Sequence, residues 1–236
     1  MSIIKNVPIC DLRAYTSPES IGELEMIKNV ALLIMPKDAS PEVMVALARV
    51  EKKNVAVTVH LSTAQQLHMM NGIFELTDAN FSKDGSSVVM ANGNTVISHL
   101  SPETKGGLIS NGVLLIQENL RDKLGIELLA VNGQTLYRDF SECKVYGNKL
   151  EADREFFTYL KPKTVVMVGN TLLLKEDVTK ETLEQSQAFL MSGNNIYCPD
   201  SLISYLRATA QAGHEVRGLS EYKKDREMGA DDYEWN

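Results

Sequence analysis

The chain has 236 residues, of which 44% are hydrophobic and 23% are charged, as in an ordinary globular protein. Its formal net charge is −7, so there is no surplus of Lys and Arg to neutralise phosphates, and we expect no nucleic-acid partner. The three cysteines are odd in number and far apart, which argues against a disulfide framework and suits a reducing compartment.

The N-terminal stretch favours a cytoplasmic protein. Residues 1–6 lack the long apolar segment of a signal peptide. No apolar run of the chain approaches the ~18 residues that a membrane helix needs. The sequence therefore predicts a cytoplasmic protein that contacts no membrane.

The first third of the chain alternates β-type runs with helical patterns. Asn6, Asn29 and Asn54 open the β-type runs, and Ser-Pro-Glu triplets begin at Ser17 and Ser40, with a third copy at Ser101 in the middle of the chain. In such a triplet the Ser caps the free N–H groups of a helix start, and the Pro fits the first helical position. The Glu meets the positive end of the helix dipole. Each unit is therefore predicted to be a strand followed by a helix.

These helix-containing units resemble leucine-rich repeats in their architecture. Each combines a short strand and a helix within about 20 to 25 residues. The fixed Leu-x-x-Leu-x-Leu-x-x-Asn pattern of that family is missing from the chain. The resemblance therefore implies an arrangement of strand and helix, and it implies no function.

The middle third is organised by a ladder of Asn-Gly pairs. The pairs recur after 21, 19 and 21 residues, and each precedes a β-type run: Asn71-Gly72, Asn92-Gly93, Asn111-Gly112 and Asn132-Gly133. Apolar runs also precede several pairs, as at residues 88–91. The pattern predicts β-helix-like units in which the chain turns with φ > 0 at every pair.

The last third inverts the pair and regains helical patterns. Gly-Asn pairs stand at Gly147-Asn148, Gly169-Asn170 and Gly193-Asn194. A period that spans nearly the whole chain predicts a mixed α/β repeat solenoid with a stacked parallel β-sheet and about 20–24 residues per unit. Leucine-rich-repeat-like units would form both ends, and β-helix-like units the middle.

The competing prediction treats each Asn-Gly pair locally. Asn-Gly between two apolar runs is the strongest short signal for an antiparallel β-hairpin, and residues 88–97 and 128–137 fit it. This alternative gives an α+β domain with hairpins at the Asn-Gly turns. The series favours the solenoid, because Asn29 and Asn54 occupy the same register without a glycine.

The composition changes near the C-terminus. We predict residues 1–216 to form a single solenoid domain, and residues 217–236 to form a charged tail or a short capping helix. The tail carries three aromatic residues that are candidates for binding a partner: Tyr222, Tyr233 and Trp235.

No catalytic, cofactor or metal motif stands out. The chain contains no phosphate-binding loop, no dinucleotide fingerprint and no nucleophile elbow. His60 and His99 fall at strand ends two units apart, so at the ~4.8 Å spacing of strands they would lie too far apart to share a metal. Cys10, Cys143 and Cys198 are expected to be small buried residues. We therefore predict no cofactor and no metal.

Two function classes remain. The favoured one is a non-catalytic interaction or scaffold protein that self-associates through its N-terminal unit, because an uncapped solenoid end exposes strand edges. The alternative is a carbohydrate-active β-helix-type enzyme that uses acidic residues along one edge. The candidates for that edge are Asp11, Asp38, Asp78, Asp139, Asp177 and Asp200. Turn and helix-cap chemistry explains the same residues without a substrate.

Overall fold

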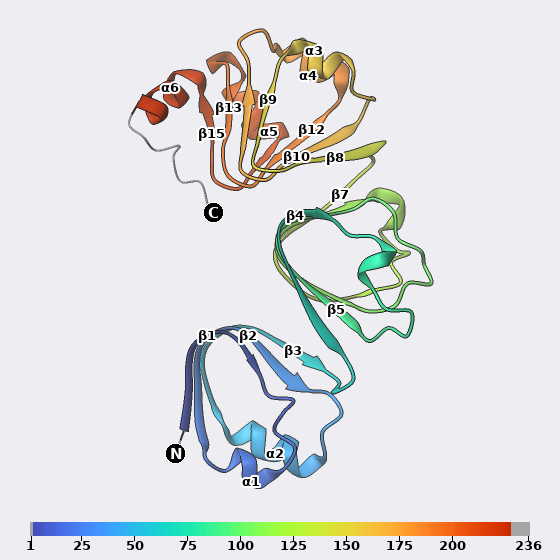
Figure 1. Cartoon of the computed structure of the whole chain (residues 1–236), viewed down its shortest axis with the longest axis vertical. Helices are drawn as coiled ribbons and strands as arrows, with labels where there is room; N and C mark the ends of the chain where they lie inside the picture. The colour runs from blue at the N-terminus through green and yellow to red at the C-terminus, as the bar shows by residue number, and fades with distance from the viewer. Residues whose placement is uncertain (1, 228–236) are drawn as a thin grey trace.

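Residues 2–227, the described part of the chain, are built mainly from parallel β-strands with a few short helices. The structure is a computed structural model, and Figure 1 shows three groups of elements along its long axis. The strands form four sheets, one of three strands and three of four strands. All strand pairs within residues 2–227 are parallel. The predicted parallel pairing is confirmed, but in four sheets rather than one.

The first group of elements, which we call the first stack, has one sheet. Its strands pair in chain order: β1 (Ser2–Asp11), β2 (Leu24–Pro36) and β3 (Glu51–Leu61). Helix α1 (Pro18–Ile21) follows β1, and helix α2 (Pro41–Arg49) follows β2. The hydroxyls of Ser17 and Ser40 accept hydrogen bonds from N–H groups in the first turns of these helices. The helix starts therefore form as the Ser-Pro-Glu triplets predict.

The second stack also follows chain order. Its strands are β4 (Gln66–Glu75), β5 (Ser87–Ile97), β6 (Gly107–Gln117) and β7 (Glu127–Arg138). Only one-turn 3₁₀ helices, η1 (Asp78–Asn80) and η2 (Glu118–Leu120), interrupt the loops between these strands. The middle of the chain is therefore rich in β-structure, as its sequence predicts.

The third stack contains two sheets. The first sheet consists of β8 (Glu142–Tyr146), β10 (Thr164–Val168), β12 (Phe189–Ser192) and β14 (Gln211–Ala212). The second consists of β9 (Lys149–Ala152), β11 (Thr171–Leu174), β13 (Ile196–Cys198) and β15 (Val216–Gly218). Helices return here: α3 (Arg154–Thr158), α4 (Lys180–Ser186), η3 (Asp200–Leu202), α5 (Ile203–Thr209) and α6 (Leu219–Glu227).

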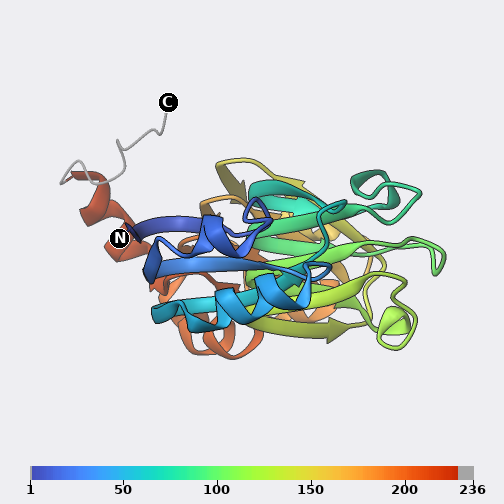
Figure 2. The ribbon, with the colours of Figure 1, turned by 90° about the horizontal axis from the view of Figure 1, so that it is seen from below.

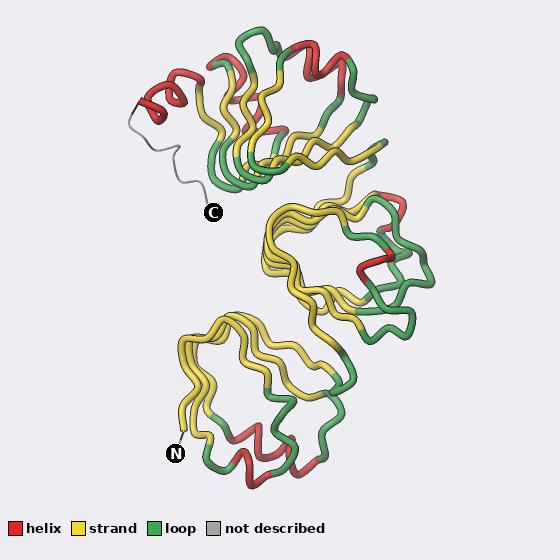
Figure 3. Tube along the Cα trace, viewed as in Figure 1, coloured by secondary structure: helices red, strands yellow, loops and turns green. Residues whose placement is uncertain are grey.

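Each Asn-Gly pair lies in the middle of one strand. Asn71 is opposite Asn92 in the neighbouring parallel strand, and Gly72 is opposite Gly93. The strands bend at these pairs and run as stacked arcs, which are yellow in Figure 3. A hairpin would instead reverse the chain and pair the two arms of one strand with each other. The alternative of antiparallel hairpins in an α+β domain is therefore wrong.

The first two stacks reach the required bend in different ways. In the second stack the glycines adopt positive φ values between 100° and 154°: Gly72, Gly93, Gly112 and Gly133. In the first stack Asn6, Asn29 and Asn54 take positive φ themselves, at 58°, 54° and 51°. Asn tolerates the left-handed region better than most residues, so no glycine is needed there.

The glycines also permit a close approach between neighbouring strands. A Cβ atom on Gly93 would lie 2.1 Å from the carbonyl oxygen of Gly72. A Cβ atom on Gly169 would lie equally close, at 2.1 Å, to the carbonyl oxygen of Gly147. At these corners, therefore, a side chain is excluded by the backbone of the preceding layer.

Apolar side chains fill each stack and the two spaces between stacks. The space between the first and second stacks holds Leu32, Ile34, Val59, Leu61, Val88, Met90 and Ile109. The space between the second and third stacks holds Val96, Val113, Leu115, Phe140, Val165, Met167, Phe189 and Met191. The stacks are therefore joined by packing, because no sheet continues from one stack to the next.

Residues 62–65 connect the first stack to the second. The guanidinium of Arg13 donates to two carbonyl groups of this connector, one of them over 2.9 Å. The carboxylate of Asp38 accepts hydrogen bonds from the N–H and the hydroxyl of Thr63 over 3.0 and 2.8 Å. Because Asp38 follows β2 and Arg13 follows β1, the connector passes back from β3 to the level of β1 before β4 begins.

A second short connector, residues 139–141, leads into the third stack. The side-chain amide of Gln117, at the end of β6, exchanges two hydrogen bonds with the backbone of Phe140 over 2.9 and 3.0 Å. Strand β4 contacts β8, and β3 contacts β7. All three stacks therefore begin on the same side of the molecule. In Figure 2, β1 and β4 lie toward the top, and β3 and β7 lie toward the bottom.

Candidate interaction surface

The first strands of the stacks leave their outer edges open on one side of the molecule, which we call the starting face. It is formed by β1, β4, β8 and β9, each the terminal strand of its sheet. A terminal strand presents a row of N–H and C=O groups that another strand can pair with. Within residues 2–227, no strand covers these edges.

Apolar side chains are exposed on the starting face. Ile3 in β1 is 48% exposed, Met69 in β4 is 59% exposed and Val145 in β8 is 43% exposed. The residues opposite the last two in the next strands are Met90 and Met167, and both are buried. The same position is therefore apolar in successive strands, and it is exposed only where the sheet ends.

The asparagine ladders end on this face as well. The amide of Asn29 donates to Oδ1 of Asn6 over 2.7 Å, and that of Asn92 donates to Oδ1 of Asn71 over 2.9 Å. Residues 2–227 offer no acceptor to the amide nitrogens of Asn6 and Asn71. Another strand stacked on this face would continue both ladders.

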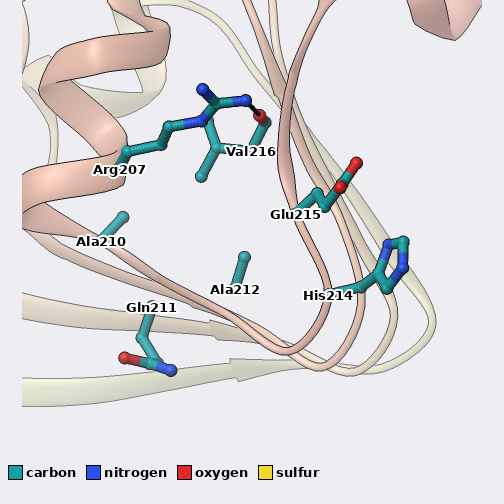
Figure 4. Close-up of a pocket in the computed structure, with 7 residues that line it drawn as sticks. All are labelled: Arg207, Ala210, Gln211, Ala212, His214, Glu215 and Val216. Carbon is teal, nitrogen blue, oxygen red and sulfur yellow. Dashed lines mark hydrogen bonds between the residues drawn. The ribbon is translucent and has the colours of Figure 1, made fainter.

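The opposite side of the molecule, which we call the finishing face, is formed by β3, β7, β14 and β15. At the end of the third stack it is hollowed to about 360 Å³. Figure 4 shows the side chains of Ala210 and Ala212 on one side of the hollow, with Arg207 and Val216 facing them. One guanidinium nitrogen of Arg207 donates to the carbonyl oxygen of Val216 over 3.3 Å. Small side chains therefore leave the interior of the last layer open.

Two of the predicted acidic residues organise loops. Asp38 binds Thr63 of the first connector, and Asp78 accepts hydrogen bonds from the N–H of Ser101, over 2.9 Å, and from the hydroxyl of Thr104. The Thr63 hydroxyl lowers the pKa of Asp38, and the Thr104 hydroxyl lowers the pKa of Asp78. Both carboxylates therefore accept hydrogen bonds from residues in turns of the chain.

The other predicted acidic residues have local roles too. Asp11 forms an ion pair with Arg13 at 2.7 Å, and Asp139 forms one with Lys163 at 2.6 Å. Asp177 accepts a hydrogen bond from the N–H of Arg154 over 3.3 Å, and Asp200 is the first residue of η3. This geometry agrees with turn and cap chemistry and supplies no argument for an acidic catalytic edge.

The predicted histidine pair and the three cysteines are placed apart from one another in the structure. His60 lies in β3 of the first stack and His99 follows β5 of the second, so they do not share an edge. Burial raises the pKa of the Cys143 and Cys198 thiols to about 12, and it also raises the pKa of the Cys10 thiol. In the described part of the chain, no three His, Cys, Asp or Glu side chains are grouped to hold a metal ion.

Of the three predicted partner-binding residues, the structure describes one. Tyr222 in α6 is 6% exposed, and its ring lies 4.9 Å from the ring of Tyr197 between centroids. The ammonium of Lys149 donates to the Tyr222 hydroxyl over 2.6 Å. Helix α6 is thereby held on the outer face of the sheet that contains β13. Tyr233 and Trp235 lie outside the described residues.

Sequence reasoning missed the residues that mark the starting face. Ile3, Met69 and Val145 belong to ordinary apolar runs, so their types carry no sign of exposure. The available signal was spacing: Asn71 follows Asn54 after 17 residues, a shorter step than the others in the ladder. That short step coincides with the connector at which one stack ends and the next begins.

No family model, no curated protein and no solved structure matches this chain. Across residues 2–227, none of the helices combines the length and apolar character needed to cross a lipid bilayer.

Proposed function

We propose that the protein is a non-catalytic scaffold that self-associates through the open strand edges of its starting face. In this proposal the chain is a repeat solenoid folded into three adjacent stacks, and β1 of the N-terminal unit supplies one of the edges. The proposed domain comprises residues 1–216, followed by the segment 217–236, and the proposed location is the cytoplasm.

One observation carries the proposal: an apolar side chain is exposed on the first strand of every stack. Ile3, Met69 and Val145 lie on one side of the molecule beside unpaired backbone groups. Natural proteins usually protect such edges with charges, prolines or covering segments. Strand β1 contains the exposed Lys5 and Pro8, and β8 contains Lys144, so these edges are protected in part. The exposed apolar side chains beside those residues are suited to pairing with another chain.

A substitution series tests the proposal. Association of the wild-type chain is measured by sedimentation over a range of concentrations and is compared with that of a variant carrying Ile3→Lys, Met69→Lys and Val145→Lys. We expect the wild type to associate and the variant to remain monomeric. Val45→Lys is the matched control, because Val45 is 53% exposed but lies on helix α2.

The series also separates the edges. The loss of association caused by Ile3→Lys alone measures the contribution of the N-terminal unit to self-association. The loss caused by Val145→Lys alone measures the contribution of the third stack. A wild-type chain that stays monomeric at high concentration refutes self-association. Equal weakening by Val45→Lys would show that the substitutions act through net charge rather than through the edges.

A further inference from the structure

The two ends of the third stack have complementary shapes. At the starting end, Tyr146 and Phe156 are half-buried, and their rings meet edge to face with centroids 6.0 Å apart. At the finishing end, the last layer contributes Ala210 and Ala212 to the hollow of about 360 Å³. Bulky aromatic side chains therefore close one end, and the other end keeps a hollow that small side chains and Arg207 border.

The register of the strands relates these residues to one another. Tyr146 lies opposite Val168, Val168 opposite Ser192, and Ser192 opposite Ala212. They form one column of inward-facing positions. If a further strand paired with β14 in the same register, the residue at the equivalent position of that strand would lie over Ala212. In a second copy of the chain, that residue is Tyr146.

A second column leads to the same pairing. Leu150 lies opposite Leu172, Leu172 opposite Ile196, and Ile196 opposite Val216. Val216 borders the hollow, and Leu150 is half-buried at the starting end. The two apolar positions would therefore meet if the finishing end of one copy lay on the starting end of another.

Gly147 supplies independent evidence for a covering layer. A Cβ atom on Gly169, Gly193 or Gly213 would lie 2.0 to 2.1 Å from the carbonyl oxygen of the glycine one layer earlier. A Cβ atom on Gly147 would meet nothing within 4 Å, and its φ lies outside the left-handed region. Among residues 2–227, nothing requires a glycine at this position. The carbonyl of Gly213 from a second copy would require one.

The backbone bonds at these corners are open at both ends. The N–H of Asn170 donates to the carbonyl of Asn148, the N–H of Asn194 to that of Asn170, and the N–H of His214 to that of Asn194, each over 2.9 Å. The series begins at Asn148 and ends at His214. A second copy in register would add the bond from its Asn148 N–H to the carbonyl of His214.

Helix α6 does not occupy the finishing end. It turns onto the outer face of the neighbouring sheet, where the ring of Tyr222 packs against the ring of Tyr197. A helix lying over β14 and β15 would have filled the hollow. Residues 2–227 therefore leave the last layer of the stack uncovered.

We infer that copies of this chain associate head to tail, with the starting end of one third stack seated on the finishing end of the next. This inference rests on the proposed self-association and specifies its geometry. The contact is heterologous, because two different surfaces meet, and a pair of joined copies retains one free surface of each kind. Successive copies therefore extend an open chain of molecules.

The number of layers limits which stacks can join. The second and third stacks each have four layers, whereas the first has three. A translation of four layers, about 19 Å at the spacing of paired strands, brings the ends of the second and third stacks together. It leaves one layer missing between β3 and the next copy of β1, so in this geometry β1 lies outside the contact and Ile3→Lys should leave head-to-tail association unchanged. The third stack, with its hollow and its Gly147 corner, therefore defines the contact.

Two variants that block opposite surfaces test the inference. Gly147→Ala adds a methyl group to the starting end, where the single chain has open space. Ala212→Phe fills the hollow of the finishing end. We expect each variant to fold like the wild type, as judged by circular dichroism and thermal unfolding. We also expect each to raise the dissociation constant of self-association more than about tenfold.

Mixing the two variants is the decisive measurement. The finishing end of Gly147→Ala and the starting end of Ala212→Phe are both intact, so a mixture should form one-to-one heterodimers by sedimentation and native mass spectrometry. Gly22→Ala is the matched control, because a Cβ atom there has only ordinary contacts at 3.5 Å. It should assemble like the wild type.

The outcomes separate the two proposals. If the wild type associates but Gly147→Ala or Ala212→Phe associates equally well, the head-to-tail geometry is wrong and self-association stands. Absence of heterodimers in the mixture also overturns the geometry. If the wild type does not associate, the proposed function itself fails. Should Gly147→Ala misfold, Ala212→Phe mixed with Tyr146→Ala, which removes the aromatic side chain of the starting end, replaces it.

Discussion

Asn29 donates a hydrogen bond to Oδ1 of Asn6 over 2.7 Å and accepts one from Asn54 over 3.0 Å. Its backbone also has a φ of 54°. Asn29 therefore contributes both to the ladder of asparagine hydrogen bonds and to the bend of strand β2. Replacing it with Ala removes two hydrogen bonds and places an alanine in the left-handed region.

We expect Asn29→Ala to lower the free energy of unfolding by about 2 kcal/mol, measured by urea denaturation. Asn29→Gly loses the same hydrogen bonds but tolerates the positive φ, so its loss should be smaller. Equal losses in the two variants would show that the backbone conformation contributes nothing. An unchanged urea midpoint for Asn29→Ala would show that the asparagine ladder does not stabilise the first stack.

Gly72 and Gly93 share a positive φ but differ in their surroundings. A Cβ atom on Gly93 would lie 2.1 Å from a backbone oxygen, whereas one on Gly72 would meet nothing within 4 Å. We expect Gly93→Ala to cost at least about 2 kcal/mol more in unfolding free energy than Gly72→Ala, because only Gly93→Ala forces two strands apart. Similar urea midpoints for the two variants would refute this explanation of the glycine column.

Arg13 fixes the connector that ends the first stack. It donates to the carbonyls of Ser62 and Gln65 and forms an ion pair with Asp11, and its side chain is only 15% exposed. We expect Arg13→Met to lower the free energy of unfolding by about 2 kcal/mol, because the connector loses a charged donor. The matched control Arg49→Met should change it by less than about 0.5 kcal/mol, since Arg49 is exposed on α2. A similar loss in both variants would contradict the role of Arg13.

Asp84 should titrate below the usual range of carboxyl groups. Hydrogen bonds from the Ser82 and Ser86 hydroxyls and the Ser86 N–H lower its pKa from 3.8 to about 2. Because the pKa is depressed in the folded state, the associated stability is fully present above the unfolded value of about 4. It is lost as the pH falls through the folded value of about 2.

NMR titration of the Asp84 carboxyl group measures this directly. The expected apparent pKa is about 2, and Ser86→Ala should move it upward, because the variant removes the hydroxyl that donates to Oδ1 over 2.8 Å. An ordinary pKa for Asp84 in the wild type would show that these hydrogen bonds do not persist in solution.

The sequence predicts the corners better than it predicts the assembly of the strands. The period of Asn-Gly pairs correctly indicates positive φ and parallel pairing: Asn71 lies opposite Asn92, and Asn92 lies opposite Asn111. The loops between the strands absorb the difference between steps of 21 and 19 residues. The Ser-Pro-Glu triplets at Ser17 and Ser40 correctly indicate helix starts. The third triplet, at Ser101, is followed by a turn and no helix, because Gly106 and Gly107 come soon after it and disfavour helix formation.

The sequence does not predict that the strands divide into three stacks, and the reason is physical. The four-residue connector at residues 62–65 resembles any polar turn, and its path is decided by distant groups such as Arg13 and Asp38. The sequence does not predict the starting face for the same reason. Whether Val145 or Met167 is buried depends on which strand ends the sheet, and local patterning does not contain that information.

The pairing of each strand with the strand one layer later also governs how folding proceeds. Asn29 meets Asn6 across only 23 positions of the chain, and closing so short a loop costs little entropy. The hydrogen-bond ladder of the first stack is complete at residue 61, before any residue of the second stack is needed. During synthesis, β1, β2 and β3 can therefore pair while the C-terminal half of the chain is still inside or not yet made by the ribosome.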